Sequence, residues 1–163
     1  MTEDYYVIDT SSLIDLNKFN PIDIYPSVWK KIEVLIDQGQ LFSPIEVFNE
    51  LVKQDDKVAE WAKQHKKMFK PITPKQTEIV TQILKKYPSI INIKKEFSAD
   101  PWVIALAVEF SRNKQQTLTP LKWLVVTEES QRENKIRIPL ICKDFNIGYL
   151  RIFDMFRNKG WKF

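Results

Sequence analysis

The sequence predicts an α/β fold: a single three-layer domain over residues 1–163, with a central parallel sheet of four or five short strands and helices on both faces. Two apolar runs rich in β-branched and aromatic residues, 5–8 and 123–127, have the length of buried strands. Between them, apolar residues recur at helical spacing in several segments. The chain has only 3 glycines and no repeats, which leaves little room for an interdomain linker.

The first half of the chain supplies two of the predicted strands. After the strand at 5–8, a polar cluster and then Leu13 and Leu16 indicate a short helix. Pro26 opens a helix that runs to about Gln38, and Gly39 ends it. A brief strand is expected at 41–43, followed by a helix from Pro44 to about Lys53.

The second half alternates in the same way. Its expected elements are amphipathic helices at 57–69 and 75–87, an apolar helix at 102–110, strands at 123–127 and 139–142, and a closing helix at 149–159. Prolines fall in the gaps between several of these segments, where they end helices. Parallel strands of this kind place a ligand site beyond their carboxyl ends.

Composition narrows the chemistry to carboxylates. The chain has one cysteine, Cys142, and one histidine, His65, so a structural zinc site and an internal disulfide are both excluded. His65 lies in a polar stretch expected to be a solvated helix face, and Cys142 reads as a buried apolar residue. Carboxylates select hard cations such as Mg²⁺ or Mn²⁺.

The single cysteine fits a reducing cytoplasm, and the hydropathy of the chain is ordinary for a soluble protein. The net charge is +4 and the pI is about 9.0, which permits an anionic partner such as nucleic acid. No apolar run approaches the roughly 20 residues of a membrane span. The N-terminus carries two acids where an export signal would carry positive charge, so we expect no membrane association.

Several acids fall where the predicted strands end. Asp9 follows the first strand, and Glu128 and Glu129 follow the strand at 123–127. These carboxylates are expected to converge at one edge of the sheet. Each also has a purely structural interpretation: Asp9 can cap the next helix, and the two glutamates can be solvated loop residues.

Two further acids are ambiguous from pattern alone. Asp100 precedes Pro101 and an apolar helix, and this is favoured as a helix N-cap. Glu50 falls with Glu46 on the polar side of the helical wheel, opposite the apolar side, so solvated glutamates are the simpler interpretation. Spacing alone leaves both choices open.

Taken together, four segments resemble the motifs of PIN domains. Residues 7–11 (VIDTS) look like the opening strand with Asp-x-Ser, and 43–51 (SPIEVFNEL) look like the second motif with its helical glutamate. Residues 100–107 (DPWVIALA) are similar to the third motif, and 124–129 (LVVTEE) to the fourth, which usually ends in aspartate. The shared motifs span 5–142 and leave 143–163 as a C-terminal extension they do not explain.

The resemblance implies a PIN-like fold and a Mg²⁺- or Mn²⁺-dependent endoribonuclease, closest to the VapC-type toxins of type II toxin–antitoxin pairs. A small antitoxin and a homodimer would then be its partners. An alternative is a PIN-like module, catalytically weak or inactive, that binds RNA or a protein partner. The implied catalytic and metal-binding acids are Asp9, Glu50, Asp100 and Glu129, with Glu128 as the substitute for Glu129, and the supporting residues are Ser11 and Thr127.

An acidic centre needs nearby cations to attract RNA, because carboxylates repel phosphates. The basic residues proposed for that contact are Lys66, Lys67, Lys70, Lys94, Lys95 and Arg132. A phosphatase of the aspartyl-phosphate kind would need a second aspartate two residues after the first, where this chain has Ser11. The sequence therefore favours a nuclease over such a phosphatase.

Overall fold

The strand β1 (Glu3–Ile8) lies at the centre of the sheet, with its last three residues fully buried. A computed structural model describes residues 3–54, 56–90, 99–113, 121–130 and 137–163. Within these residues five parallel strands form one sheet in the order β3-β2-β1-β4-β5. The other strands are β2 (Leu41–Pro44), β3 (Phe69–Lys70), β4 (Leu121–Val126) and β5 (Gly148–Leu150).

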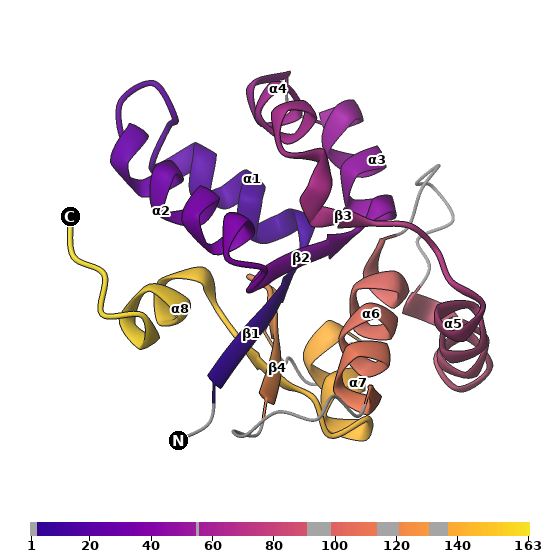
Figure 1. Cartoon of the computed structure of the whole chain (residues 1–163). Helices are drawn as coiled ribbons and strands as arrows, with labels where there is room; N and C mark the ends of the chain where they lie inside the picture. The colour runs from indigo at the N-terminus through magenta and orange to yellow at the C-terminus, as the bar shows by residue number, and fades with distance from the viewer. Residues whose placement is uncertain (1–2, 55, 91–98, 114–120, 131–136) are drawn as a thin grey trace.

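Helices cover both faces of the sheet, as the sequence predicts (Figure 1). In Figure 1, α1, α2 and α8 lie to one side of the strands, and α5, α6 and α7 lie to the other. The α-helices are α1 (Thr10–Phe19), α2 (Pro26–Asp37), α3 (Ile45–Gln54), α4 (Asp56–Gln64), α5 (Pro74–Lys86), α6 (Asp100–Arg112), α7 (Ile138–Asp144) and α8 (Ile152–Asn158). Short 3-10 turns occupy Lys66–Met68 and Pro88–Ile90.

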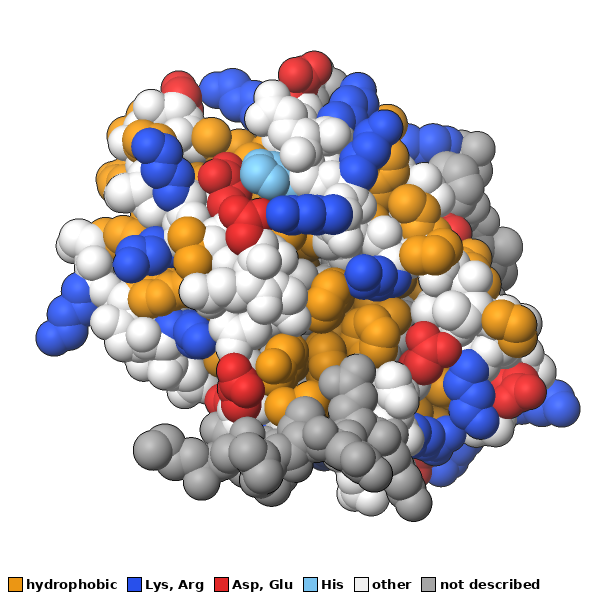
Figure 2. All heavy atoms as spheres, in the orientation of Figure 1, with side chains coloured by type: hydrophobic (Ala, Val, Ile, Leu, Met, Phe, Trp, Pro, Cys, Tyr) orange, Lys and Arg blue, Asp and Glu red, His pale blue; other side chains and the backbone are white. Residues whose placement is uncertain are grey.

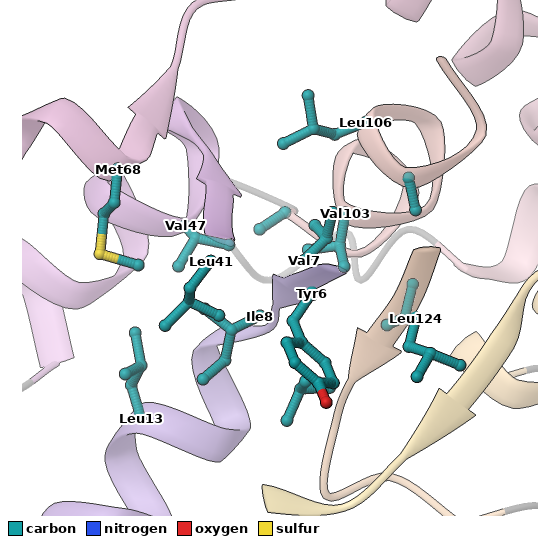
Figure 3. Close-up of a cluster of buried hydrophobic side chains, with 14 of the residues drawn as sticks. Tyr6, Val7, Ile8, Leu13, Leu41, Val47, Met68, Val103, Leu106 and Leu124 are labelled. Carbon is teal, nitrogen blue, oxygen red and sulfur yellow. The ribbon is translucent and has the colours of Figure 1, made fainter. Parts of the chain in front are cut away.

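Successive side chains of β1 point to opposite faces of the sheet, so the hydrophobic core lies on both faces. In Figure 3, Val7 lies beside Val103 of α6, whereas Ile8 lies near Leu13 and Leu41 on the other side of the sheet. All five side chains are fully buried and belong to one hydrophobic cluster. Burial on both faces is typical of a parallel sheet and explains the unbroken apolar character of β1.

The pairing of β1 with its neighbours shows where the carboxyl edge of the sheet lies. β1 pairs with β4 along its whole length, from Glu3 opposite Leu121 to Ile8 opposite Val126. The Ser43 hydroxyl donates a 2.7 Å hydrogen bond to the carbonyl of Ile8. Therefore β1, β2 and β4 end at nearly the same level, and the residues that follow β1 and β4 lie side by side.

Three element predictions are wrong. Residues 139–142, expected as a strand, lie in α7, because a short apolar run fits either structure and Pro139 suits the first turn of a helix. The helix expected at 57–69 ends at Gln64 and is followed by β3. The closing helix begins at Ile152 rather than 149, because Gly148–Leu150 pairs with β4 as an edge strand.

The predicted strands at 5–8, 41–43 and 123–127 and the predicted helices at 26–38, 44–53, 75–87 and 102–110 are confirmed to within a few residues. Gly39 ends α2 with a φ of 69°, a left-handed conformation that glycine adopts without steric cost. None of the described helices combines the length and the apolar character needed to cross a bilayer.

Candidate metal centre

Three acids from distant parts of the chain meet at the carboxyl edge of the sheet. Asp9 follows β1, Asp100 is the first residue of α6, and Glu129 follows β4. One carboxylate oxygen from each lies within 4.8 Å of those from the other two. They line a cavity of about 150 Å³ together with Ser11 and Glu50. The convergence expected from strand order is confirmed for Asp9 and Glu129, and Asp100, which strand order did not select, lies with them.

Asp9 is held in place by three hydrogen bonds. Its Oδ1 accepts from the backbone N–H of Thr10 at 2.7 Å. Its Oδ2 accepts from the hydroxyls of Ser11 at 2.9 Å and Thr127 at 3.0 Å. The side chain is only 2% exposed. Asp9 is therefore both the N-cap of α1 and a member of the acid group, so the two sequence interpretations coexist.

The burial and crowding of the acids raise the pKa of Asp9. Burial, and next the charge of Glu129, raise the pKa of Asp9 from 3.8 to about 7, with a smaller contribution from Glu50. The hydroxyls of Ser11 and Thr127 oppose that rise, because they stabilise the charged carboxylate. Crowded, desolvated carboxylates are stabilised in their charged form by a bound cation, so the donor set fits a hard divalent ion.

Glu129, rather than Glu128, joins the acid group. The backbone N–H groups of both residues are fixed by the supporting hydroxyls: Glu128 donates to Ser11 Oγ and Glu129 to Thr127 Oγ1, each at 3.1 Å. The Glu128 side chain lines a separate groove with Asp15, where burial raises its pKa. The choice that spacing left open is thus decided by the direction of the two side chains.

Glu50 is buried, which corrects the helical-wheel interpretation. Its side chain is 5% exposed, and Oε1 accepts a 2.8 Å hydrogen bond from the backbone N–H of Ala99. The prediction that Asp100 is the N-cap of its helix is also wrong by one residue, because the cap position is Ala99. The buried residues of α3 are Val47, Glu50 and Leu51, a single stripe at i, i+3 and i+4 spacing in which Glu50 lines the acid cavity, so the buried stripe contains a glutamate among apolar residues.

At or just before the start of three helices, a backbone N–H group is bonded to one of the acids that line this cavity. Thr10 in α1 donates to Asp9, Ala99 before α6 donates to Glu50, and Ile138 in α7 donates to Glu129 Oε2 at 3.0 Å. Helix N-termini carry partial positive charge, which offsets part of the repulsion between the carboxylates.

The sequence matches the family described as Domain of unknown function (DUF4411) over residues 6–163. The chain belongs to the DUF4411 family. The matched range contains all the acids described above, as well as the C-terminal stretch that lies outside the PIN-like motifs. No curated protein matches the chain.

Two of the lysines proposed for RNA contact in this DUF4411 domain, Lys67 and Lys70, have partners other than the acid group. Lys67 forms an ion pair with Asp37 at the end of α2, which precedes β2 and so lies toward the opposite edge of the sheet. The Lys70 ammonium lies 4.8 Å from the ring centre of Phe42. Figure 2 shows basic side chains dispersed over the visible face rather than collected in one patch.

The remaining basic residues proposed for RNA contact are placed only in part. Lys66 is exposed beside Lys67, in the turn that precedes β3. Lys94, Lys95 and Arg132 lie outside the described residues.

Two residues near the acids of this DUF4411 domain were missed from the sequence. Gln54 lines the acid cavity, and its position one helical turn after Glu50 could have indicated this. Arg151 lines an adjoining cavity of about 280 Å³ with Thr127 and Glu129. No sequence signal marks Arg151, because β5, the strand that ends just before it, was itself not predicted.

Proposed function

We propose that this DUF4411 protein is a divalent-metal-dependent endoribonuclease that uses Mg²⁺ or Mn²⁺. The observation that carries the proposal is the approach of Asp9, Asp100 and Glu129 oxygens to within 4.8 Å of one another. Oxygen donors of this kind suit hard cations, which take part in phosphodiester hydrolysis. The likeness of four motifs to PIN domains supports the same reaction and the choice of RNA as substrate.

In this proposal, Asp9, Asp100 and Glu129 hold the cation. The cation, when bound, supplies Lewis acidity that activates water and offsets the charge of the phosphate. Ser11 and Thr127 keep Asp9 in one orientation, because both hydroxyls donate to the same carboxylate oxygen. The fixed orientation lowers the reorganisation needed when the cation arrives.

A phosphate contact close to the acids is provided by Arg151. This residue lines the cavity that also contains Glu129, whereas Lys67 is paired with Asp37 far from it. A guanidinium can donate two parallel hydrogen bonds to a phosphate group. We therefore assign the approach of the RNA backbone to the side of the acid cavity where β5 ends.

The biological setting that fits best is the toxin of a type II toxin–antitoxin pair in the cytoplasm. This rests on the VapC-type resemblance of the motifs. A small antitoxin would be the protein partner, and an arginine inserted among the carboxylates is one physical means of inhibition. A homodimer is part of the same proposal. Co-expression with a neighbouring short reading frame should relieve growth inhibition.

The decisive experiment measures cleavage of single-stranded RNA with Mg²⁺ or Mn²⁺, and with EDTA. Wild type should cleave only with the cation and leave 5′-phosphate and 3′-hydroxyl ends. Asp9→Asn and Asp100→Asn should each lower the rate by at least about 100-fold, since each removes a charged ligand. Asp23→Asn is the matched control, because Asp23 is an exposed acid paired with Lys57.

Two results would contradict the proposal in different ways. Cleavage that persists in EDTA and in both ligand variants would remove the acid group from the reaction. RNA binding without any cleavage would instead favour the alternative of a binding module that has lost catalysis.

A further inference from the structure

Glu50 differs from the other acids in the cavity because one of its carboxylate oxygens binds the backbone at the start of α6. It lines the same cavity as Asp9, Asp100 and Glu129, but it is not in the group whose oxygens lie within 4.8 Å of one another. Its Oε1 instead accepts a 2.8 Å hydrogen bond from the backbone N–H of Ala99. Both residues are buried, with Glu50 5% and Ala99 0% exposed.

The bond is made at the start of α6. Ala99 is the cap residue of that helix, and its own side chain has no oxygen with which to cap it. The Ala99 carbonyl accepts the first helical bond, from Val103 at 3.0 Å. In a capping box, a glutamate inside the helix bonds the N–H of the cap residue. Here a glutamate from α3 bonds that same N–H.

Asp100 is the next residue along the chain, so the anchored peptide carries a proposed metal ligand. A shift of the Ala99 backbone would move the Asp100 carboxylate relative to Asp9 and Glu129. The negative charge of Glu50 is also favourable at the N-terminus of α6. Breaking a buried bond of this kind leaves the N–H without an acceptor.

We infer that Glu50 is a positioning residue: it fixes the start of α6 and thereby the place of Asp100, and does not itself hold the cation. The inference rests on the proposed metal-dependent function and revises the ligand role implied by the PIN resemblance. In this inference, the glutamate of the second PIN-like motif fixes the position of the aspartate of the third.

The test compares Glu50→Gln, Glu50→Ala and Asp100→Asn by Mn²⁺ titration followed by electron paramagnetic resonance. The amide of Gln retains an oxygen acceptor of the same reach but carries no charge. A positioning role predicts a Mn²⁺ Kd within about 3-fold of wild type for Glu50→Gln and about 10-fold weaker binding for Glu50→Ala. Asp100→Asn should lose more affinity than either.

Glu46→Gln is the matched control, since Glu46 lies one turn earlier on α3 and outside the cavity. It reports the effect of removing one negative charge from that helix. Melting curves and circular dichroism identify folded variants. The rescue of Mn²⁺ affinity by Gln, relative to Ala, is the readout that loss of a charged ligand would not produce.

The outcomes separate this inference from the proposed function. If Glu50→Gln binds Mn²⁺ as poorly as Asp100→Asn, or fails to fold, the inference is overturned while the nuclease proposal stands. If wild type binds Mn²⁺ but cleaves no RNA, the nuclease proposal fails and the Kd values still decide the role of Glu50. If wild type binds no Mn²⁺, both are refuted.

Discussion

The hydroxyl of Thr127 donates a 3.0 Å hydrogen bond to Oδ2 of Asp9, across 118 positions of sequence. The same oxygen of Thr127 accepts the backbone N–H of Glu129 at 3.1 Å. Thr127 is only 1% exposed. Its buried hydroxyl therefore links two proposed metal ligands. The ends of β1 and β4 are joined at the point where the acids meet.

Replacement of Thr127 by valine keeps the shape of the side chain and removes both hydrogen bonds. We expect a loss of about 1–3 kcal/mol in unfolding free energy, because the buried Asp9 carboxylate and the Glu129 N–H lose partners. Thr127→Ser should retain most of the stability, since it keeps the hydroxyl. Urea denaturation of the three proteins measures the difference, and equal stability of the Val and Ser variants would contradict the role of the hydrogen bonds.

The stability of the metal-free protein should depend on pH through Asp9. Burial and the charge of Glu129 raise the pKa of Asp9 to about 7 in the folded state, above the 3.8 of an unperturbed aspartate. A raised folded pKa means that the protonated form is favoured by folding. Its stabilising contribution is full below about pH 4 and is lost as pH rises through about 7.

The measurement is urea unfolding in EDTA at pH 5 and pH 8, for wild type and Asp9→Asn. The stability of wild type relative to the variant should fall between these values, by at most about 1.4 kcal/mol per pH unit. The variant is the control because Asn does not titrate. A constant difference across this range would show that Asp9 is already charged at pH 5. Saturating Mn²⁺ should remove the dependence by binding the charged form.

Gly148 in β5 faces Leu124 of β4, and a Cβ atom at this position would overlap Leu124 Cδ2. Gly148→Ala should therefore lower the melting temperature, since the overlap forces Leu124 out of its packing at a cost of about 1–3 kcal/mol. The double variant with Leu124→Ala removes the overlapping atom. Its melting temperature should lie above the value expected if the two single effects were additive.

Cys142 in α7 is fully buried beside the acid group. Burial above all, with the charges of Asp9 and Glu129, raises the pKa of its thiol to about 12. Thiolate is the reactive form, so Ellman's reagent should label the native protein only when it opens. Mg²⁺ or Mn²⁺ should slow the labelling because it stabilises the folded state. Fast labelling of the folded protein at neutral pH would contradict this burial.

The parts of the fold that sequence predicts are those with strong periodicity. The strand before Asp9 and the helix after Asp100 are buried nearly all round, so their apolar runs stand out. β3 and β5 contain only two and three residues, too few to show a period of two. α7 was mistaken for a strand because its seven residues leave its apolar stripe short.

Position after a strand was sufficient to place Asp9 at the carboxyl edge of the sheet, because strand order alone brings that residue there, but it left the cap and the acid-group interpretations equally open. The roles of Glu50 and of Glu128 against Glu129 could not be predicted in this way. They depend on which way a flexible side chain turns, and that is set by partners distant in sequence, such as Ala99 and Ile138. The spacing of acids along the sequence does not identify those partners.

The central position of β1 has a consequence for synthesis. β1 is made first, yet its whole-length partner β4 begins at Leu121, so the middle of the sheet must wait for most of the chain. Asp9, Asp100 and Glu129 can meet only after that pairing. A nascent chain still on the ribosome short of Glu129 would lack the assembled acid group, so the proposed nuclease activity should be absent from fragments that stop before β4.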